Sequence, residues 1–278
     1  MTFKSFRHAG SKLTILNRIK KYLRCILSGR YREENITYEG VYRNFIDAHM
    51  SQVNLTGYVN ENWLDIEIVK LEKMIETYSK NPQINGNYRD RDLLLVVAGM
   101  NAEEIKILDI GSGFANTFFY LKSNFKKRLD YVAVDLKEIV HTLNQRMYGY
   151  GNFKAYTFNE VPSEKFDLVY FGSSLQYIEE FENHLVQICK LKAPVIFISD
   201  TPMGNENTFV TVQVNMEGRR IPRWVFSKTE VIGLLECHGY NLVAESLVDW
   251  HQKIHNFNNF PTSYRQTQNC NLLFEYKS

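Results

Sequence analysis

Ile105–Tyr120 reads IKILDIGSGFANTFFY, which predicts a strand, a tight turn and a helix in succession. The first six residues form a short apolar run, typical of a buried parallel strand. Residues 111–113, Gly-Ser-Gly, predict the turn, and apolar residues at helical spacing follow from Phe114. Glycines let the backbone approach a ligand closely, and a helix N-terminus offers free N–H donors. We therefore expect a ligand cradle here.

Acidic residues end two neighbouring predicted strands. Asp109 lies two residues before Gly111. A carboxylate there repels a pyrophosphate but can hold a cation, so S-adenosylmethionine (SAM), which has an ammonium and no phosphate, fits better than a dinucleotide. A dinucleotide fingerprint would also want a third glycine at position 116, which is Asn. Asp135 follows about 20 residues on, where a carboxylate can accept hydrogen bonds from both ribose hydroxyls. The alternative is that both acids merely cap helices.

This order of elements resembles the class I SAM-dependent methyltransferases. Asp109 and the turn at 111–113 match their first motif, Asp135 matches their second, and Ala115 stands where the family usually has a third glycine. The resemblance covers roughly residues 89–278. It implies that Asn159 reads the adenine amino group, with a plain turn residue as the alternative. The implied cofactor-binding residues are Asp109, Gly111, Ser112, Gly113, Asp135, Leu136, Asn159 and Ser173.

Seven strands are expected in this region, with helices between them. The fold predicted from the resemblance is an α/β, Rossmann-like sheet of seven strands in the order 3-2-1-4-5-7-6. Its last strand is antiparallel, and helices cover both faces. The predicted strands are Ile105–Ile110, Tyr131–Val134, Phe153–Phe158, Lys165–Phe171, Pro194–Ser199, Asn241–Val248 and Asn271–Tyr276.

The preceding part of the chain predicts helices. Glu61–Lys80 begins with acids and ends with a lysine, as the helix dipole prefers, and a second helix runs from Arg89 through Met100. Ser227 and Glu230 form a capping sequence for a further helix that ends at Gly239. We expect three parts: a basic amphipathic helix within 1–32, a helical extension or lid at 33–100, and a SAM-binding domain at 101–278.

Charge is unevenly distributed over the 278 residues. Residues 1–32 carry nine Lys or Arg and no acid, so the remaining 24 basic and 31 acidic side chains give the rest of the chain a net charge of −7. Such an acidic body is not a general nucleic-acid binder. Ser11–Ser28 predicts a basic amphipathic helix, which can lie on an anionic membrane or pack on the protein's own body or a dimer partner.

Composition is that of an ordinary globular protein, with 44% hydrophobic and 23% charged residues. The longest apolar run, Leu93–Met100, is too short to span a membrane, and no signal peptide is recognised. The four cysteines are far apart and form no CxxC pair, so they are expected to be reduced thiols. We expect a cytoplasmic protein. Peripheral contact with the inner face of the membrane and the oligomeric state are both left open by the sequence.

A narrower resemblance rests on five short segments. EGVYRNFIDA, RDRD, SSLQYI, SDTP and RIPRWVFS are similar to one group of bacterial proteins assigned as methyltransferases and often associated with surface-polysaccharide synthesis. This resemblance covers about Tyr38 to the C-terminus. It implies a small-molecule or saccharide acceptor.

Methyl transfer from a sulfonium needs positioning of the two reactants, and an oxygen acceptor gains from a general base. Asp200, after the fifth strand, and His251, between the last two strands, are the candidate bases. Asp200 can also simply cap a turn. Tyr177 and Gln176 are candidates for the acceptor pocket. Arg219, Arg220 and Arg223 can grip a phosphate or acidic sugar or be surface charges. His251 and His255 are four residues apart, but no metal pair is expected because their segment does not look helical.

Three functions remain open from the sequence. The first is SAM-dependent O-methylation of a saccharide or related small acceptor in cell-surface polysaccharide synthesis. The second is a catalytically degenerate SAM-binding scaffold. The third is an NAD-dependent enzyme, against which Asp109 argues.

Overall fold

The protein is described by a computed structural model covering residues 37–51, 55, 61–204, 207–214, 219–248, 260–265 and 267–277. The predicted N-terminal helix and the residues His251 and His255 lie outside these described residues. No helix within the described ranges is long and apolar enough to cross a membrane.

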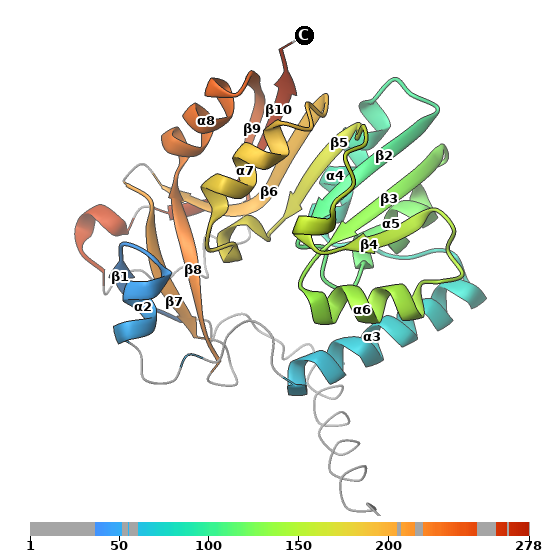
Figure 1. Cartoon of the computed structure of the whole chain (residues 1–278), viewed down its shortest axis with the longest axis horizontal. Helices are drawn as coiled ribbons and strands as arrows, with labels where there is room; N and C mark the ends of the chain where they lie inside the picture. The colour runs from blue at the N-terminus through green and yellow to red at the C-terminus, as the bar shows by residue number, and fades with distance from the viewer. Residues whose placement is uncertain are drawn as a thin grey trace, which may run out of the picture.

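The chain alternates strands and helices over most of its described length (Figure 1). The strands are β1 Thr37–Tyr42, β2 Glu104–Ile110, β3 Arg128–Val134, β4 Phe153–Tyr156, β5 Leu168–Gly172, β6 Val195–Gly204, β7 Phe209–Val214, β8 Arg220–Ser227, β9 Tyr240–Leu247 and β10 Thr267–Tyr276. The helices are α2 Phe45–Ser51, α3 Glu61–Lys80, α4 Tyr88–Gly99, α5 Asn116–Asn124, α6 Lys137–Arg146, α7 Phe181–Cys189 and α8 Lys228–Cys237, with 3-10 turns η2 Phe158–Glu160, η3 Leu175–Tyr177 and η5 Thr262–Tyr264.

The seven predicted strands occur and have their predicted neighbours. β4, β3, β2, β5 and β6 are parallel and lie side by side in that order. β10 pairs antiparallel with both β6 and β9, so the last strand is the antiparallel one. This part of the sheet is the Rossmann-like arrangement expected from the resemblance.

The predicted number of strands is wrong, because the described sheet has ten. β1, β7 and β8 form an antiparallel group that joins the rest through two parallel pairs between β6 and β8, Met203 with Phe226 and Gly204 with Ser227. The junction exists because β6 continues five residues beyond its predicted end at Ser199. One of these strands, β1, lies in the segment 33–100 expected to be helical. At the start of α8, Ser227 is the N-cap but its side chain makes no capping hydrogen bond.

A bulge at Asp200 allows β6 to pair with β5 along its first half and with β8 at its end. β6 last pairs with β5 at Ser199, and Asp200 then takes a left-handed φ of 54°. The amide oxygen of Asn271 on β10 accepts hydrogen bonds from the Ser199 hydroxyl, at 3.0 Å, and from the Asp200 N–H, at 2.9 Å. Two residues of β6 thus face one of β10, as in a β-bulge, and the strand changes direction there.

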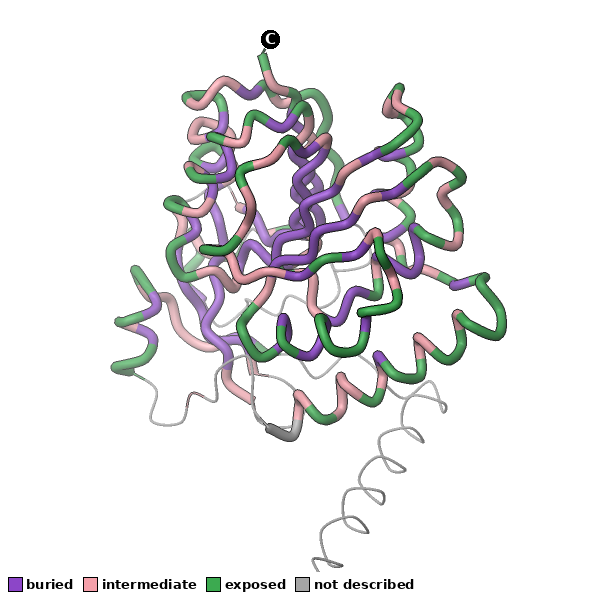
Figure 2. Tube along the Cα trace, turned by 45° about the vertical axis from the view of Figure 1, so that its right-hand side comes forward, coloured by how far each residue is buried: buried purple, intermediate pink, exposed green. Residues whose placement is uncertain are grey.

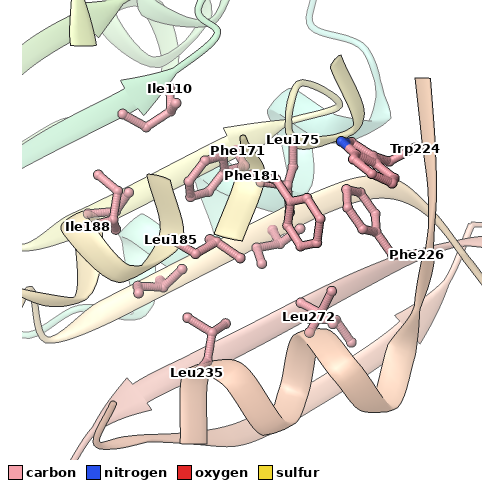
Figure 3. Packing of buried hydrophobic residues seen from close by; sticks show 14 of the residues in the cluster. Ile110, Phe171, Leu175, Phe181, Leu185, Ile188, Trp224, Phe226, Leu235 and Leu272 are labelled. Carbon is pink, nitrogen blue, oxygen red and sulfur yellow. The ribbon is translucent and has the colours of Figure 1, made fainter. Parts of the chain in front are cut away.

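Apolar side chains on the two faces of the sheet form two large clusters, and a third, small one joins β1, β7 and β8 through Tyr38, Phe209 and Val225. Helices α3 to α6 contribute to one, around Phe118, Phe119 and Tyr131. Helices α7 and α8 contribute to the other, where Phe181 and Leu185 pack toward Phe226 of β8 (Figure 3). The middle of the sheet is buried, whereas α3 is largely exposed or half-buried and packs along the edge of the molecule (Figure 2). This layering leaves the carboxyl ends of the parallel strands for a ligand.

Candidate functional site

A cavity of about 820 Å³ lies at the carboxyl ends of β2, β3 and β5. Its wall combines the glycine turn after β2 and the residues after β3 and β5 with side chains of α3, the first turn of α4 and the loop before α7. Of the predicted cofactor residues, Asp109, Gly111, Ser112, Gly113, Asp135, Leu136 and Ser173 line it. Asn159 does not, although Thr157 and Phe158 beside it do.

The backbone N–H groups of the glycine turn donate hydrogen bonds within the protein. Those of Gly111 and Ser112 both donate to the carbonyl of Val134, at 2.8 and 3.2 Å. That of Gly113 donates to the Asp135 carboxylate at 2.7 Å. In a dinucleotide site such donors would bind the pyrophosphate. Here all three hydrogen-bond to the end of β3 and hold the turn against it.

Gly111 sits where the chain tolerates no side chain. Its φ is 74°, and a Cβ on it would lie 2.3 Å from the Cβ of Ser174. Ser174 is itself held, because its hydroxyl donates to the carbonyl of Ile110. The turn therefore packs directly on the loop after β5, and the two together form the floor of the cavity.

Asp109 is buried at the end of β2, and the pKa of its carboxyl is well above its ordinary value. Burial raises the pKa of its carboxyl to about 7, and the nearby carboxylates of Asp135 and Asp90 act in the same direction. The Tyr131 hydroxyl, which donates to Asp109, and Arg89 oppose the shift. A carboxyl with a pKa this high gains most from a cationic ligand, because such a ligand compensates for the lost solvation.

Asp135 lies at the neighbouring position at the end of β3, partly open to the cavity. Burial raises the pKa of its carboxyl to about 6, and the N–H groups of Leu136 and Gly113 oppose this. Each carboxylate oxygen accepts one of those two N–H groups and keeps a further lone pair. Two ligand hydroxyls can therefore bind it side by side.

The first turn of α4 brings a cation and a third acid to the same wall. Asn87 and Asp90 form a reciprocal capping box. Asp90 is buried and also accepts a hydrogen bond from the Thr117 hydroxyl at 2.9 Å. Arg89 donates to the carbonyl of Gly172 at 3.2 Å and lies 3.9 Å from the Asp200 carboxylate. Two residues of the RDRD segment, Arg89 and Asp90, therefore belong to the cavity wall.

Replacing Asn87 by Ala should lower the free energy of unfolding by about 1 kcal/mol, because the cap of α4 is lost. Asn87→Ser should retain most of the stability, since its hydroxyl can accept the same N–H. Chemical denaturation measures both changes. No loss in Asn87→Ala, or an equal loss in Asn87→Ser, would contradict the stabilising role of this cap.

Asp200 lies behind Arg89 and is not among the cavity-lining residues. It is buried, and its carboxylate accepts hydrogen bonds from the Tyr88 hydroxyl and, at 2.6 Å, from the Asn269 amide. In this arrangement it orients Arg89 and Tyr88. Its predicted role as a base stays a prediction, as does that of His251 outside the described residues.

His184 is a cavity residue that the sequence reasoning missed. It lies on α7, with its ring 4.0 Å from that of Phe158 between centroids. Its Nδ1 is 2.9 Å from the carbonyl of Glu180, and because a carbonyl only accepts, Nδ1 carries the proton. Nε2 is then left with a lone pair in the neutral ring. No local sequence signal marks this residue.

Tyr177 lines the cavity, whereas Gln176 does not, and the acceptor role of Tyr177 stays a prediction. Gln176 is buried, and its amide donates to the Ser173 carbonyl and hydroxyl. Trp63 and Glu67 of α3 also line the cavity and were not expected there. The amphipathic pattern of α3 shows that one face is covered, but it does not reveal that part of this face meets a cavity.

The three predicted arginines differ in their surroundings. Arg220 pairs with Glu39 of β1. Arg223 is only 5% exposed, and Arg219 is half-buried. Both Arg219 and Arg223 have buried N–H groups that find no hydrogen-bond partner among the described residues. Arg223 is therefore not a surface charge.

No protein-family model and no curated protein matches the chain. Several solved methyltransferase structures are similar to it. One is a 1,6-didemethyltoxoflavin-N1-methyltransferase of Burkholderia thailandensis, solved with 1,6-didemethyltoxoflavin and S-adenosylhomocysteine. It is 14% identical in sequence, the match covers 81% of this chain and 94% of that chain, and the TM-score is 0.49. The CcbJ methyltransferase of Streptomyces caelestis is 13% identical, with coverages of 73% and 96% and a TM-score of 0.45. The N-terminal domain of EvdMO1, solved with S-adenosylhomocysteine and D-fucose, is 12% identical, with coverages of 75% and 97% and a TM-score of 0.47. At these identities and TM-scores, the likeness fixes neither a family nor an acceptor for this chain.

Proposed function

We propose that the chain is a SAM-dependent methyltransferase that methylates a hydroxyl of a saccharide or related small acceptor. The observation that carries the cofactor assignment is that Asp109 and Asp135 line one cavity on either side of the glycine turn. A cationic nucleoside without phosphate complements this pair. SAM would supply an electrophilic methyl group on a sulfonium there.

The cavity residues suggest how each part of SAM would be held. Asp135 has free lone pairs for the two ribose hydroxyls, and Asp109 offers a carboxylate to the ammonium. Leu136 is 50% exposed, which leaves its side chain available to pack on the adenine. Arg89 is a cation on the same wall and can pair with the SAM carboxylate.

An NAD-dependent enzyme fits the same cavity poorly. The turn N–H groups that would bind a pyrophosphate donate to Val134 and Asp135 instead. The carboxylates of Asp90, Asp109 and Asp135 would also repel it. We therefore expect SAM and S-adenosylhomocysteine to bind and NADH not to bind.

The acceptor would occupy the end of the cavity near Tyr177. His184, with a lone pair on Nε2, is a third candidate for the base that takes the hydroxyl proton, besides Asp200 and His251. The saccharide acceptor and its place in surface-polysaccharide synthesis rest on the sequence resemblance alone.

A degenerate SAM-binding scaffold remains the second candidate. The observation favouring it is that Asp200 is held by Tyr88 and Asn269, outside the cavity-lining residues. Calorimetry with SAM, followed by assay for S-adenosylhomocysteine with a panel of sugars and sugar nucleotides, separates the two. Tight binding without turnover on any acceptor would favour the scaffold. Absence of SAM binding would reject both.

SAM affinity is expected to fall as the pH drops below about 7, where the Asp109 carboxyl becomes protonated. Only its ionised form attracts the ammonium, so the dissociation constant should rise about tenfold for each pH unit below that pKa. Calorimetry between about pH 5 and about pH 7.5 measures this, and binding near pH 6 should release protons. Asp109→Asn should bind weakly with a shallower pH dependence. A flat profile in the unsubstituted protein would contradict the role of Asp109.

A further inference from the structure

Arg223 is a buried cation, and one edge of its guanidinium group has no hydrogen-bond partner among the described residues. It lies on β8 opposite Thr211 of β7. Its Nη1 donates to the Gln213 amide oxygen at 2.9 Å and lies 3.4 Å from the Tyr38 hydroxyl. Its Nε and Nη2 are buried and have no partner among the described residues. These two nitrogens form one edge of the guanidinium, the fork that matches a carboxylate in a bidentate pair.

The absence of an acid beside Arg223 is unusual for a buried charge. Buried charges are normally paired, because removal from water is otherwise unfavourable. No described carboxylate lies within ion-pair distance of Arg223, whereas neighbouring Arg220 pairs with Glu39. The rings of Tyr38 and Tyr177, with centroids 5.5 and 5.7 Å from the guanidinium carbon, compensate for the charge only in part.

Tyr177 connects Arg223 to the cavity. Its side chain is half-buried and lines the cavity. Its hydroxyl donates at 3.0 Å to the same Gln213 oxygen that accepts from Arg223. The Tyr177 ring therefore contacts both the cavity and the guanidinium, so a ligand in the cavity reaches Arg223 only when this side chain rotates away.

We propose that Arg223 binds the carboxylate of the acceptor, so that the acceptor is an acidic sugar of the uronic-acid class. This inference rests on the proposed methyltransferase function. The carboxylate pairs side-on with Nε and Nη2, while Gln213 and Tyr38 hold the guanidinium in place through Nη1. A single guanidinium matches the single charge of a carboxylate better than it matches a phosphate dianion, and its planar edge matches a planar acceptor.

The test measures binding of D-glucuronate and D-galacturonate against D-glucose and D-galactose, by calorimetry with the full chain, with and without SAM. The uronates should bind about tenfold or more tightly than their neutral counterparts. Arg223→Gln should abolish this preference, and Arg223→Lys should not restore it, because an ammonium lacks the fork. Arg128→Gln, at a residue whose side chain is 77% exposed and lies outside the cavity, is the matched control and should leave the preference unchanged.

Affinity for SAM is measured on every variant and should stay at the value of the unsubstituted protein, which shows that each variant is folded. Equal affinity for charged and neutral sugars, or a uronate preference that survives in Arg223→Gln, would overturn the proposal. Tighter binding of inorganic phosphate than of uronate, lost in Arg223→Gln, would overturn the assignment of a carboxylate. Failure of the unsubstituted protein to bind SAM would instead reject the proposed function, since uronate binding is also measured without SAM.

Discussion

Asp135→Ala should weaken SAM binding by about 100-fold or more. A hydrogen bond to a charged group contributes about 1.5–3 kcal/mol, and Asp135 is expected to accept one from each ribose hydroxyl. Each 1.4 kcal/mol corresponds to about tenfold in affinity. The substitution also removes the acceptor of the Gly113 N–H, so the turn itself loses an anchor. Isothermal titration calorimetry with SAM measures the change.

The matched control is Asp130→Ala on the same strand. Asp130 lies near the other end of β3 and pairs with Lys106 at 3.1 Å, away from the cavity-lining residues. Its loss removes one partner of Lys106, which keeps its ion pair with Glu164 at 2.7 Å, and should leave the affinity for SAM unchanged. If the two variants bound SAM equally well, Asp135 would have no role in holding the ribose.

Gly111→Ala should lower the free energy of unfolding by about 2–5 kcal/mol. An alanine at a φ of 74° is strained by about 1–2 kcal/mol, and overlap in a packed site adds about 1–3 kcal/mol. The added methyl group would lie 2.3 Å from the Cβ of Ser174, so backbone must move on one side of the cavity floor. SAM affinity should fall as well, because the turn and the loop after β5 separate.

Gly113→Ala distinguishes the overlap from the backbone strain. Its φ is 55°, but an added Cβ would meet no atom within 4 Å. Only the strain of about 1–2 kcal/mol should remain. Chemical denaturation of both variants gives the comparison, and a loss in Gly113→Ala as large as that in Gly111→Ala would contradict the packing described for the floor.

Much of the Rossmann-like part could be predicted because its signals are local. The apolar run of β2, the glycine turn and the acid after β3 are close in sequence, and the structure brings them to one cavity. Helix α3 has the predicted bounds because acids at its start and Lys80 at its end agree with the helix dipole. Helix α4 begins at Tyr88, one residue before its predicted start.

The missed features depend on contacts between distant segments. β8 contains Pro222 and directly precedes a helix, and it is not among the seven predicted strands. Its strand character depends on β7 and on the far end of β6. The bulge that redirects β6 is held by Asn271, far along the chain. His184 likewise has ordinary sequence surroundings, and only its neighbours in the fold distinguish it. Arg223 was a candidate from the sequence, but its burial depends on the pairing of β8 with β7.

The division into three parts, the membrane contact of residues 11–28 and the catalytic roles of Asp200 and His251 stay predictions. Liposome flotation of the full-length chain against a chain lacking residues 1–32 tests the membrane contact. Binding of both to anionic vesicles alike would contradict it.

A crystal structure with S-adenosylhomocysteine would show directly whether this cavity is the cofactor site. We expect the ribose hydroxyls on the carboxylate of Asp135, the ammonium toward Asp109 and the carboxylate toward Arg89, all within the cavity at the ends of β2, β3 and β5. A ligand bound elsewhere, or in this cavity with its ribose away from Asp135, would contradict it.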